Sequence, residues 1–292
     1  MFTAGRLPFD WPTPSLPSVR TVTSLGRVLA VVPARAGSKG VPGKNLRTVD
    51  GRSLVARAVD AALATPAVDT VVVTTDGAAI AAEARAAGAL VVERPEALAV
   101  DTASSESALL HVLDELEREH GSVPEVLVFL QATSPFQEPA AIQEAVERVR
   151  TGAADSVFAA APSHAFLWRV DAEGRAVAVN HDAAVRPRRQ DRAPEFRETG
   201  AFTVMRTAGF RTHRHRFFGR TELVVVEATT AIDIDDESDL SLADALARTR
   251  LAARDALART RSATRDAEPT DAPIAARPTT PSGTHQTLQH QP

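Results

Sequence analysis

The sequence predicts an α/β protein with a doubly wound, mostly parallel sheet and a small added extension. Two observations lead to this fold class. In the first half of the chain, short runs of entirely apolar residues alternate with stretches of helical periodicity. Such runs are typical of parallel strands that helices cover on both faces. A glycine-rich basic segment also follows the first apolar run directly, which is where ligand-binding loops occur in open α/β sheets.

The first half contains four expected strands and four expected helices. The strands are the apolar runs at 28–33, 70–75, 90–93 and 126–131. The helices have apolar residues at helical spacing and lie at 53–65, 78–87, 105–120 and 139–150. In the third helix Leu109, Val112, Leu113 and Leu116 form one apolar face. The fourth begins with a proline, which suits a first helical turn.

The second half departs from strict alternation. Strands are expected at 156–161, 201–205, 223–227 and 231–235, with a final helix that begins near Glu237. Two short runs at 167–170 and 176–179 flank a turn sequence and predict a hairpin. We therefore expect one domain over residues 26–258, with a small extension at about 165–198.

Both ends of the chain have a different composition. Residues 1–25 are rich in proline, serine and threonine, and residues 259–292 in proline, threonine, alanine and glutamine. Neither segment shows a hydrophobic period. We expect a disordered leader and a disordered tail.

The composition excludes several functional classes. The chain has 292 residues, a formal net charge of -4 and no cysteine. Disulfide frameworks, zinc–thiolate sites and cysteine nucleophiles are therefore excluded. Mixed charges argue against a general nucleic-acid binder. The apolar runs are too short to span a bilayer, and no secretory signal pattern is present, so we expect a cytoplasmic protein without a membrane partner.

The lysines point to one loop. Of the 33 basic residues only Lys39 and Lys44 are lysines, and both lie in the segment 35–45 that follows the first expected strand. Its three glycines let a backbone approach phosphate closely, and its cations, which include Arg35, can neutralise a polyphosphate. The segment is neither a Walker A loop, since Asn45 stands in place of Ser or Thr, nor a GxGxxG motif. The alternative is a basic surface turn.

A second motif is the pair Asp233 and Asp235 in the expected strand 231–235. Alternate residues of a strand point to one face, so the two carboxylates suit Mg²⁺ that also holds substrate phosphates. The alternative is an acidic strand end that caps the next helix.

Three further segments carry candidate polar contacts. Asp101 and Ser104 precede the helix at 105, where Ser104 could cap the helix or contact a base or sugar. Gln131 ends the fourth strand, on the same side of the sheet as the first loop. Five arginines in residues 186–197, Arg189 and Arg197 among them, form a solvated charge run, a partner contact or a site for an anionic acceptor.

These motifs together resemble the CMP-N-acylneuraminate synthetases, CTP-dependent cytidylyltransferases whose relatives include the CMP-Kdo type. The similar stretches are VPARAGSKGVPGKN at 32–45, VTTDG at 73–77, RPEALAVDTASS at 94–105, LQATSP at 130–135, RQD at 189–191 and IDID at 232–235. They occur in the family order over about residues 27–250. The resemblance implies a doubly wound nucleotide-binding domain that forms a homodimer through its extension.

The resemblance also implies roles for individual residues. Arg35, Lys39 and Lys44 would hold the phosphates of CTP, assisted by the loop residues Gly37, Ser38 and Asn45. Asp101 and Ser104 would lie near the cytidine, and Gln131 and Arg189 would contact the acceptor. Asp233 and Asp235 would bind Mg²⁺.

The departures from the family pattern fall on the acceptor side. Ala132 replaces a proline, Gln137 replaces an arginine, and Thr199 precedes Gly200 where the family often has Asn. We therefore expect CMP transfer from CTP to a small acidic acceptor, which is either a phosphonate acid such as phosphonoformate in natural-product biosynthesis or an N-acylneuraminate-type sugar acid. The alternatives are a D-x-D nucleotide-sugar glycosyltransferase and a non-catalytic nucleotide sensor.

Overall fold

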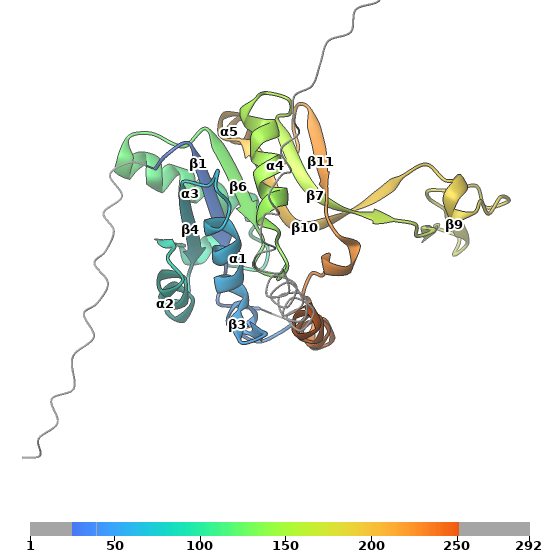
Figure 1. Cartoon of the computed structure of the whole chain (residues 1–292), viewed down its shortest axis with the longest axis horizontal. Helices are drawn as coiled ribbons and strands as arrows, with labels where there is room; N and C mark the ends of the chain where they lie inside the picture. Colours follow the sequence, from blue (N-terminus) through green and yellow to red (C-terminus); the bar gives the residue numbers. More distant parts are fainter. Residues whose placement is uncertain (1–24, 39, 251–292) are drawn as a thin grey trace, which may run out of the picture. The chain divides into compact units, whose positions relative to one another are not determined.

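The structure is a computed structural model that describes residues 25–38 and 40–250 (Figure 1). Within this range, residues up to 247 belong to one compact unit. The expected tail at 259–292 and the expected leader, apart from Leu25, lie outside the described residues.

A seven-stranded sheet forms the centre of this unit, in the order β11-β7-β10-β6-β1-β4-β5. The strands are β1 (Val28–Pro33), β4 (Thr70–Thr75), β5 (Leu90–Glu93), β6 (Val126–Leu130), β7 (Ser156–Ser163), β10 (Glu195–Arg206) and β11 (Thr221–Val225). All neighbouring pairs are parallel except those that β10 makes with β6 and β7. The sheet is therefore mostly parallel, as the apolar runs predict.

The order of the strands reverses at β1. From β1 the chain continues to β4 and β5 on one side and then returns to place β6 on the other side. Ligands of open α/β sheets bind at the carboxyl ends of the strands beside such a reversal. The fold thus places the candidate loops after β1 and β6 at the usual ligand site of this class.

Helices cover both faces of the sheet. They are α1 (Leu54–Leu63), α2 (Ala78–Ala86), α3 (Ser105–His120), α4 (Pro139–Arg150) and α5 (Thr207–His213). Alternate residues of β1 face opposite cores: Ala30 and Val32 pack with α1, α2 and α4, whereas Leu29 and Val31 pack with α3 and α5. This two-sided burial explains why β1 is apolar at every position.

Most expected elements match the structure, and the differences lie in the second half. β10 begins six residues earlier than expected, because its first half pairs with the end of β7 outside the central sheet. The expected strand 231–235 is wrong, since these residues are irregular. Ile234 there is buried against the helix that begins at 237. The hairpin of β2 (Thr48–Val49) with β3 (Arg52–Ser53), and helix α5, were not expected.

An arm formed by the ends of β7 and β10 leaves the sheet and carries a small hairpin (Figure 1). The hairpin consists of β8 (Trp168–Val170) and β9 (Ala176–Ala178), where the sequence predicts it. In the arm the Phe166 ring lies between the guanidinium groups of Arg186 and Arg192, at 4.5 and 4.3 Å from the ring centre. These contacts help to hold the arm together, although none of residues 164–198 is fully buried.

Among the residues that the structure describes, no helix combines the length and apolar character that crossing a bilayer requires.

Candidate functional site

A mainly polar cleft of about 280 Å³ opens at the carboxyl ends of β1, β5 and β6. This volume is near the lower end of the range for small-molecule sites. The cleft brings together most of the expected nucleotide-side residues and one expected acceptor residue. They are Arg35, Gly37, Ser38, Lys44, Asn45, Asp101, Ser104 and Gln131. Segments about 100 residues apart in the sequence thus form one site.

The loop after β1 is held in place by its own side chains. Asn45 is buried and donates its amide to the carbonyl oxygen of Arg35 at 2.9 Å. Gly43 has a φ of +62°, which a side chain would strain. The backbone of the loop is therefore fixed at both ends around its basic side chains. Lys39, which belongs to the same expected phosphate site, lies outside the described residues.

The loop after β1 contacts the acidic segment that contains Asp233 and Asp235. A Cβ atom on Gly40 would overlap the carbonyl oxygen of Asp235, so only glycine fits there. The side chain of Lys44 is 12% exposed, and its Nζ atom donates to the carbonyl oxygen of Ile234 and lies 3.4 Å from Asp235 Oδ1. The expected cationic and acidic motifs therefore meet, although the acidic one is not in a strand.

The two carboxylates differ in environment. The side chain of Asp235 is 83% exposed, whereas Asp233 is partly buried and its Oδ1 atom is buried without a hydrogen-bond partner. Burial raises the pKa of Asp233, opposed by a hydrogen bond from Thr133 and assisted by the charge of Asp235. A cation between them would satisfy the unpaired oxygen and offset the repulsion.

This donor set fits Mg²⁺ bound together with a nucleotide. Mg²⁺ is usually held by one or two carboxylates while phosphate and water oxygens complete its shell. Over residues 25–38 and 40–250, no group of three or more His, Asp or Glu side chains could hold a metal ion by protein ligands alone. Asp233 and Asp235 would thus hold the ion only with help from a substrate.

The start of α3 forms the opposite wall of the cleft. Ser104 caps this helix by accepting a hydrogen bond from the amide of Ser107 at 3.2 Å. The cap hypothesis is therefore correct, and Ser104 also lines the cleft. Asp101 pairs with Arg35 at 2.7 Å, so the ion pair joins the loop before α3 to the loop after β1.

Gln131 lies at the corner between the cleft and Asp233. A Cβ atom on Gly200 would be 3.0 Å from Gln131 Nε2 and 3.8 Å from Asp233 Oδ2. Gly200 has a φ of +73° and lies where the pairing of β10 with β7 shifts its register. A bulge in β10 thus makes room for the amide of Gln131 and the carboxylate of Asp233.

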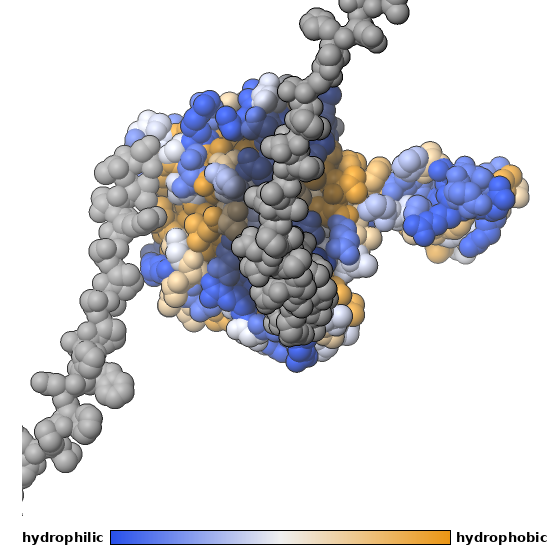
Figure 2. Space-filling view, in the orientation of Figure 1, coloured by the Kyte–Doolittle hydropathy of each residue, from blue (hydrophilic) through white to orange (hydrophobic). Residues whose placement is uncertain are grey.

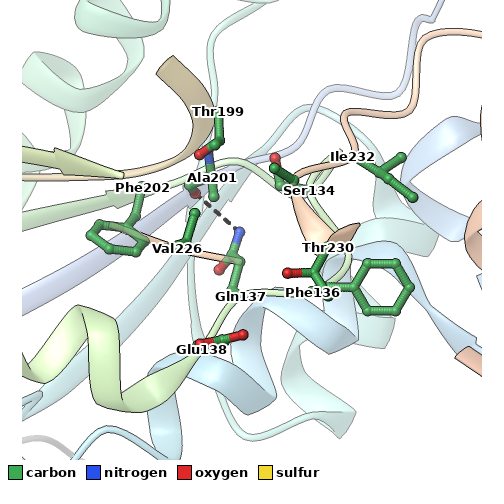
Figure 3. A pocket seen from close by; sticks show the side chains of 11 residues that line it. Ser134, Phe136, Gln137, Glu138, Thr199, Ala201, Phe202, Val226, Thr230 and Ile232 are labelled. Atoms are coloured by element: carbon green, nitrogen blue, oxygen red, sulfur yellow. Dashed lines mark hydrogen bonds between the residues drawn. The ribbon is translucent and has the colours of Figure 1, made fainter. Parts of the chain in front are cut away.

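A second, much smaller cavity of about 10 Å³ lies beside this corner (Figure 3). Gln137 points into it and donates to the carbonyl oxygens of Gln131 and Ala201, at 2.6 and 3.2 Å. Gln131 directly follows β6, and Ala201 lies within the neighbouring strand β10. Gln137, which departs from the family pattern, therefore links the backbone after β6 to the backbone of β10. We call the region around Gln131, Asp233 and Gly200 the acceptor corner.

Arg94 is a cleft residue to which the sequence reasoning gave no role. It follows β5 directly and is buried, and its Nη2 atom donates to the carbonyl oxygen of Thr74 at 2.6 Å. Its Nε atom is buried without a partner, and burial lowers its pKa, opposed by the charge of Asp76. Its position at a strand end on the ligand side of the sheet was a signal that could have identified it.

The expected acceptor arginines lie apart from the cleft lining. Arg189 is exposed on the arm, which Figure 1 shows directed away from the central sheet. Arg197 donates to the carbonyl oxygen of Ala231 at 3.1 Å and so lies beside the acidic segment. Other arginines of the run stabilise the arm: Arg188 pairs with Asp191, and Arg192 is only 7% exposed and pairs with Glu195.

Comparison with known proteins identifies the family. The family model described as cytidylyltransferase matches residues 29–256, which is more than half of the chain. The chain belongs to the cytidylyltransferase family. This membership confirms the resemblance in the motifs and favours a nucleotidyltransferase over the glycosyltransferase and sensor alternatives.

Individual relatives agree with that assignment. The chain is 36% identical over 178 residues to N-acylneuraminate cytidylyltransferase A of Danio rerio, a match of 60% of this chain and 40% of the relative. It is 32% identical over 220 residues to N-acylneuraminate cytidylyltransferase of Oncorhynchus mykiss, covering 74% and 49%. Against CMP-N,N'-diacetyllegionaminic acid synthase of Legionella pneumophila it is 43% identical over 122 residues, covering 41% and 52%. The chain thus spans about half the length of the curated relatives it matches.

A solved structure shows the same fold. CMP:2-keto-3-deoxy-manno-octonic acid synthetase, complexed with CTP, superposes with a TM-score of 0.60 at 18% sequence identity. The superposition covers 77% of this chain and 99% of that one.

Proposed function

We propose that this protein transfers CMP from CTP to an acidic acceptor and releases pyrophosphate. The observation that carries the proposal is the meeting of a cationic, glycine-rich loop with two carboxylates at the carboxyl edge of the sheet, in a chain of the cytidylyltransferase family. In the reaction an acceptor oxygen forms a bond to the α-phosphorus of CTP, and the bond to the bridging oxygen of the pyrophosphate breaks in line with it.

Positioning and charge neutralisation supply most of the catalysis in such a transfer. Arg35, Lys39 and Lys44 would bind the triphosphate, and the cap of α3 at Ser104 would lie beside the nucleoside. Mg²⁺ held by Asp233 and Asp235 would supply charge neutralisation at the phosphates. The buried Arg94 adds positive charge to the β5 side of the cleft.

Two acceptor classes fit the corner at Gln131. Three relatives in the comparison are named for N-acylneuraminate or a legionaminic acid, which favours a sugar acid. The departures from the family pattern at Ala132 and Gln137 lie beside this corner and favour a smaller acid such as phosphonoformate, as used in natural-product biosynthesis. A sugar hydroxyl must lose a proton when it attacks, whereas a phosphonate oxygen is already ionised.

We also propose that the working form is a homodimer joined through the arm. Six large apolar side chains of the arm are exposed in the single chain: Leu167, Trp168, Val170, Val179, Val185 and Phe196. Figure 2 shows further apolar surface where the arm leaves the sheet. Exposed large apolar side chains gathered on one small arm favour a contact with a partner. Arg189 lies on the same arm, so an arm that crosses to a second copy would carry it toward that copy's cleft.

Pyrophosphate release in the presence of CTP and Mg²⁺ tests the activity, with N-acetylneuraminate and phosphonoformate as separate acceptors. We expect release with one of them and a strong loss in Lys39→Ala. Arg85→Ala, which removes an exposed charge from α2, serves as the control and should remain active. Absence of release with every acidic acceptor would contradict the proposed function. Near-normal turnover of Lys39→Ala would contradict the assignment of the phosphate loop.

A further inference from the structure

The loop that follows α5 contacts two elements that line the cleft, α3 and β6. Helix α3 contributes its first turn to the cleft through Ser104 and Ser105, and β6 contributes Phe129. Both elements contact Arg216, which belongs to neither and is not among the residues that line the cleft. Its side chain contacts the start of α3 and the Phe129 ring together.

One contact is an ion pair. Arg216 Nε donates to Glu106 Oε1 at 2.8 Å, and only 17% and 14% of the two side chains are exposed. Glu106 lies in the first turn of α3, next to the cleft residue Ser105. Removing one partner of a largely buried pair leaves the other charge without compensation, so such pairs respond strongly to substitution.

The electrostatics of Glu106 agree with this geometry. Burial alone would raise the pKa of its carboxyl group. The hydrogen bond and charge of Arg216, with the backbone amide of Glu106, outweigh burial and hold the pKa below its ordinary value. Glu106 is therefore ionised at neutral pH and depends on Arg216 for compensation.

The second contact is with an aromatic ring of the cleft. The guanidinium carbon of Arg216 lies 4.7 Å from the centre of the Phe129 ring, within the range of a cation–π interaction. Phe129 is nearly fully buried in the core that it forms with α3 and α5, so the guanidinium and this core together fix the ring.

The backbone of Arg216 is itself anchored. Ser156 at the start of β7 donates its hydroxyl to the carbonyl oxygen of Arg216 at 2.6 Å. The neighbouring Phe217 packs edge-to-face on Phe158 of the same strand, with ring centres 5.3 Å apart. The side chain therefore extends from a rigid attachment on the sheet.

We propose that Arg216 is a positioning residue of the nucleotide site, which sets the first turn of α3 against the Phe129 ring so that the cleft has the shape that CTP requires. The proposal rests on the proposed function, since it names CTP as the ligand. Arg216 acts through Glu106 and Phe129 and makes no contact with the nucleotide.

A second arginine of the same segment provides a matched control. Arg211 of α5 pairs with Asp114 and Glu117 of α3, at 3.0 and 2.7 Å. These carboxylates lie two to three turns after Glu106, away from the cleft. Arg211→Gln therefore loosens the same helix without touching its cleft end.

The test is calorimetric titration of the full chain with CTP and Mg²⁺, together with thermal unfolding. We expect Arg216→Gln to raise the Kd for CTP by about 2- to 30-fold, the range for residues that act on a site through neighbours. Arg211→Gln should lower the melting temperature and leave the Kd unchanged. Arg216→Lys retains the charge opposite Glu106 but not the planar stacking on Phe129, so its Kd should lie between those of the wild type and Arg216→Gln.

Each outcome decides between the explanations. If the wild type binds CTP and Arg216→Gln binds it equally well, the positioning role is refuted while the proposed function stands. Equal weakening in Arg211→Gln would also refute it, because general loosening of α3 would then suffice. A wild type that does not bind CTP would refute the proposed function, and the positioning role with it. If Arg216→Gln does not fold, Glu106→Gln gives the same test, since it removes the charge and keeps the side-chain shape.

Discussion

Gly200 offers a sharp test of the acceptor corner. Its φ of +73° lies in the left-handed region, where a residue with a Cβ atom costs about 1–2 kcal/mol. The Cβ atom of Gly200→Ala would also be 3.0 Å from Gln131 Nε2, so the amide must move by a few tenths of an ångström. We expect the melting temperature to fall by about 2–8 °C. We also expect the acceptor KM to rise roughly three- to tenfold, because small displacements of positioning groups are costly.

Gly51→Ala separates these two effects. Gly51 has the same φ of +73°, but a Cβ atom there would have no neighbour within 4 Å. Both variants should therefore lose similar stability in thermal unfolding, and only Gly200→Ala should show a higher acceptor KM in the pyrophosphate assay, with the KM for CTP unchanged. If the two variants have the same acceptor KM, the displacement of Gln131 has no catalytic effect and the reasoning is wrong.

Three further predictions concern Asp233, Gln137 and the arm. Asp233→Asn should abolish turnover yet raise the melting temperature without Mg²⁺ at pH 7. Burial raises the pKa of Asp233, so its ionised form destabilises the fold. The increase in melting temperature of Asp233→Asn over the wild type should therefore be absent below about pH 4 and grow as the pH rises through the raised pKa. Gln137→Glu should lose about 2–4 kcal/mol in urea unfolding at neutral pH, and less in acid, because a carboxylate cannot donate to the carbonyl oxygens of Gln131 and Ala201. Arg192→Ala should speed hydrogen exchange in the arm roughly tenfold, and leave the central sheet unchanged, by removing the stacking on Phe166.

The parallel half of the fold was predictable because burial there is uniform. β1 and β4 have the bounds that the apolar runs predict, since helices cover both faces of these strands. The edge strand β5 also has its expected bounds, although its residues are only partly buried or exposed. The expected strand 231–235 was wrong because alternation alone does not provide a partner strand. Its single apolar anchor, Ile234, packs against the last helix instead. β10 was too short in the expectation because its first half pairs only with the arm, where polar residues are tolerated.

The residues of the site also fall into those that the sequence could locate and those that it could not. Arg35, Lys44 and Ser104 could be placed at one site from the sequence because strand ends and helix caps have local signals, and their roles toward CTP stay predictions. Arg216 could not, because it contacts Glu106 and Phe129, which are distant in the sequence. Arg94 was missed although its place directly after β5 was a signal. In a chain where nearly all basic residues are arginine, residue type carries little information, and only geometry separates cleft residues from structural ones.

The course of β10 has a consequence for exchanging parts between relatives. Its first half belongs to the arm, its second half lies between β6 and β7, and the bulge at Gly200 beside Gln131 separates the two. A chimera joined within this strand would combine one protein's arm with another's acceptor corner. A shift of the strand register by one residue at the junction would turn every following side chain to the opposite face of the sheet. Acceptor preference is therefore expected to transfer only when the arm, the bulge and the strand that follows are moved together as one cassette.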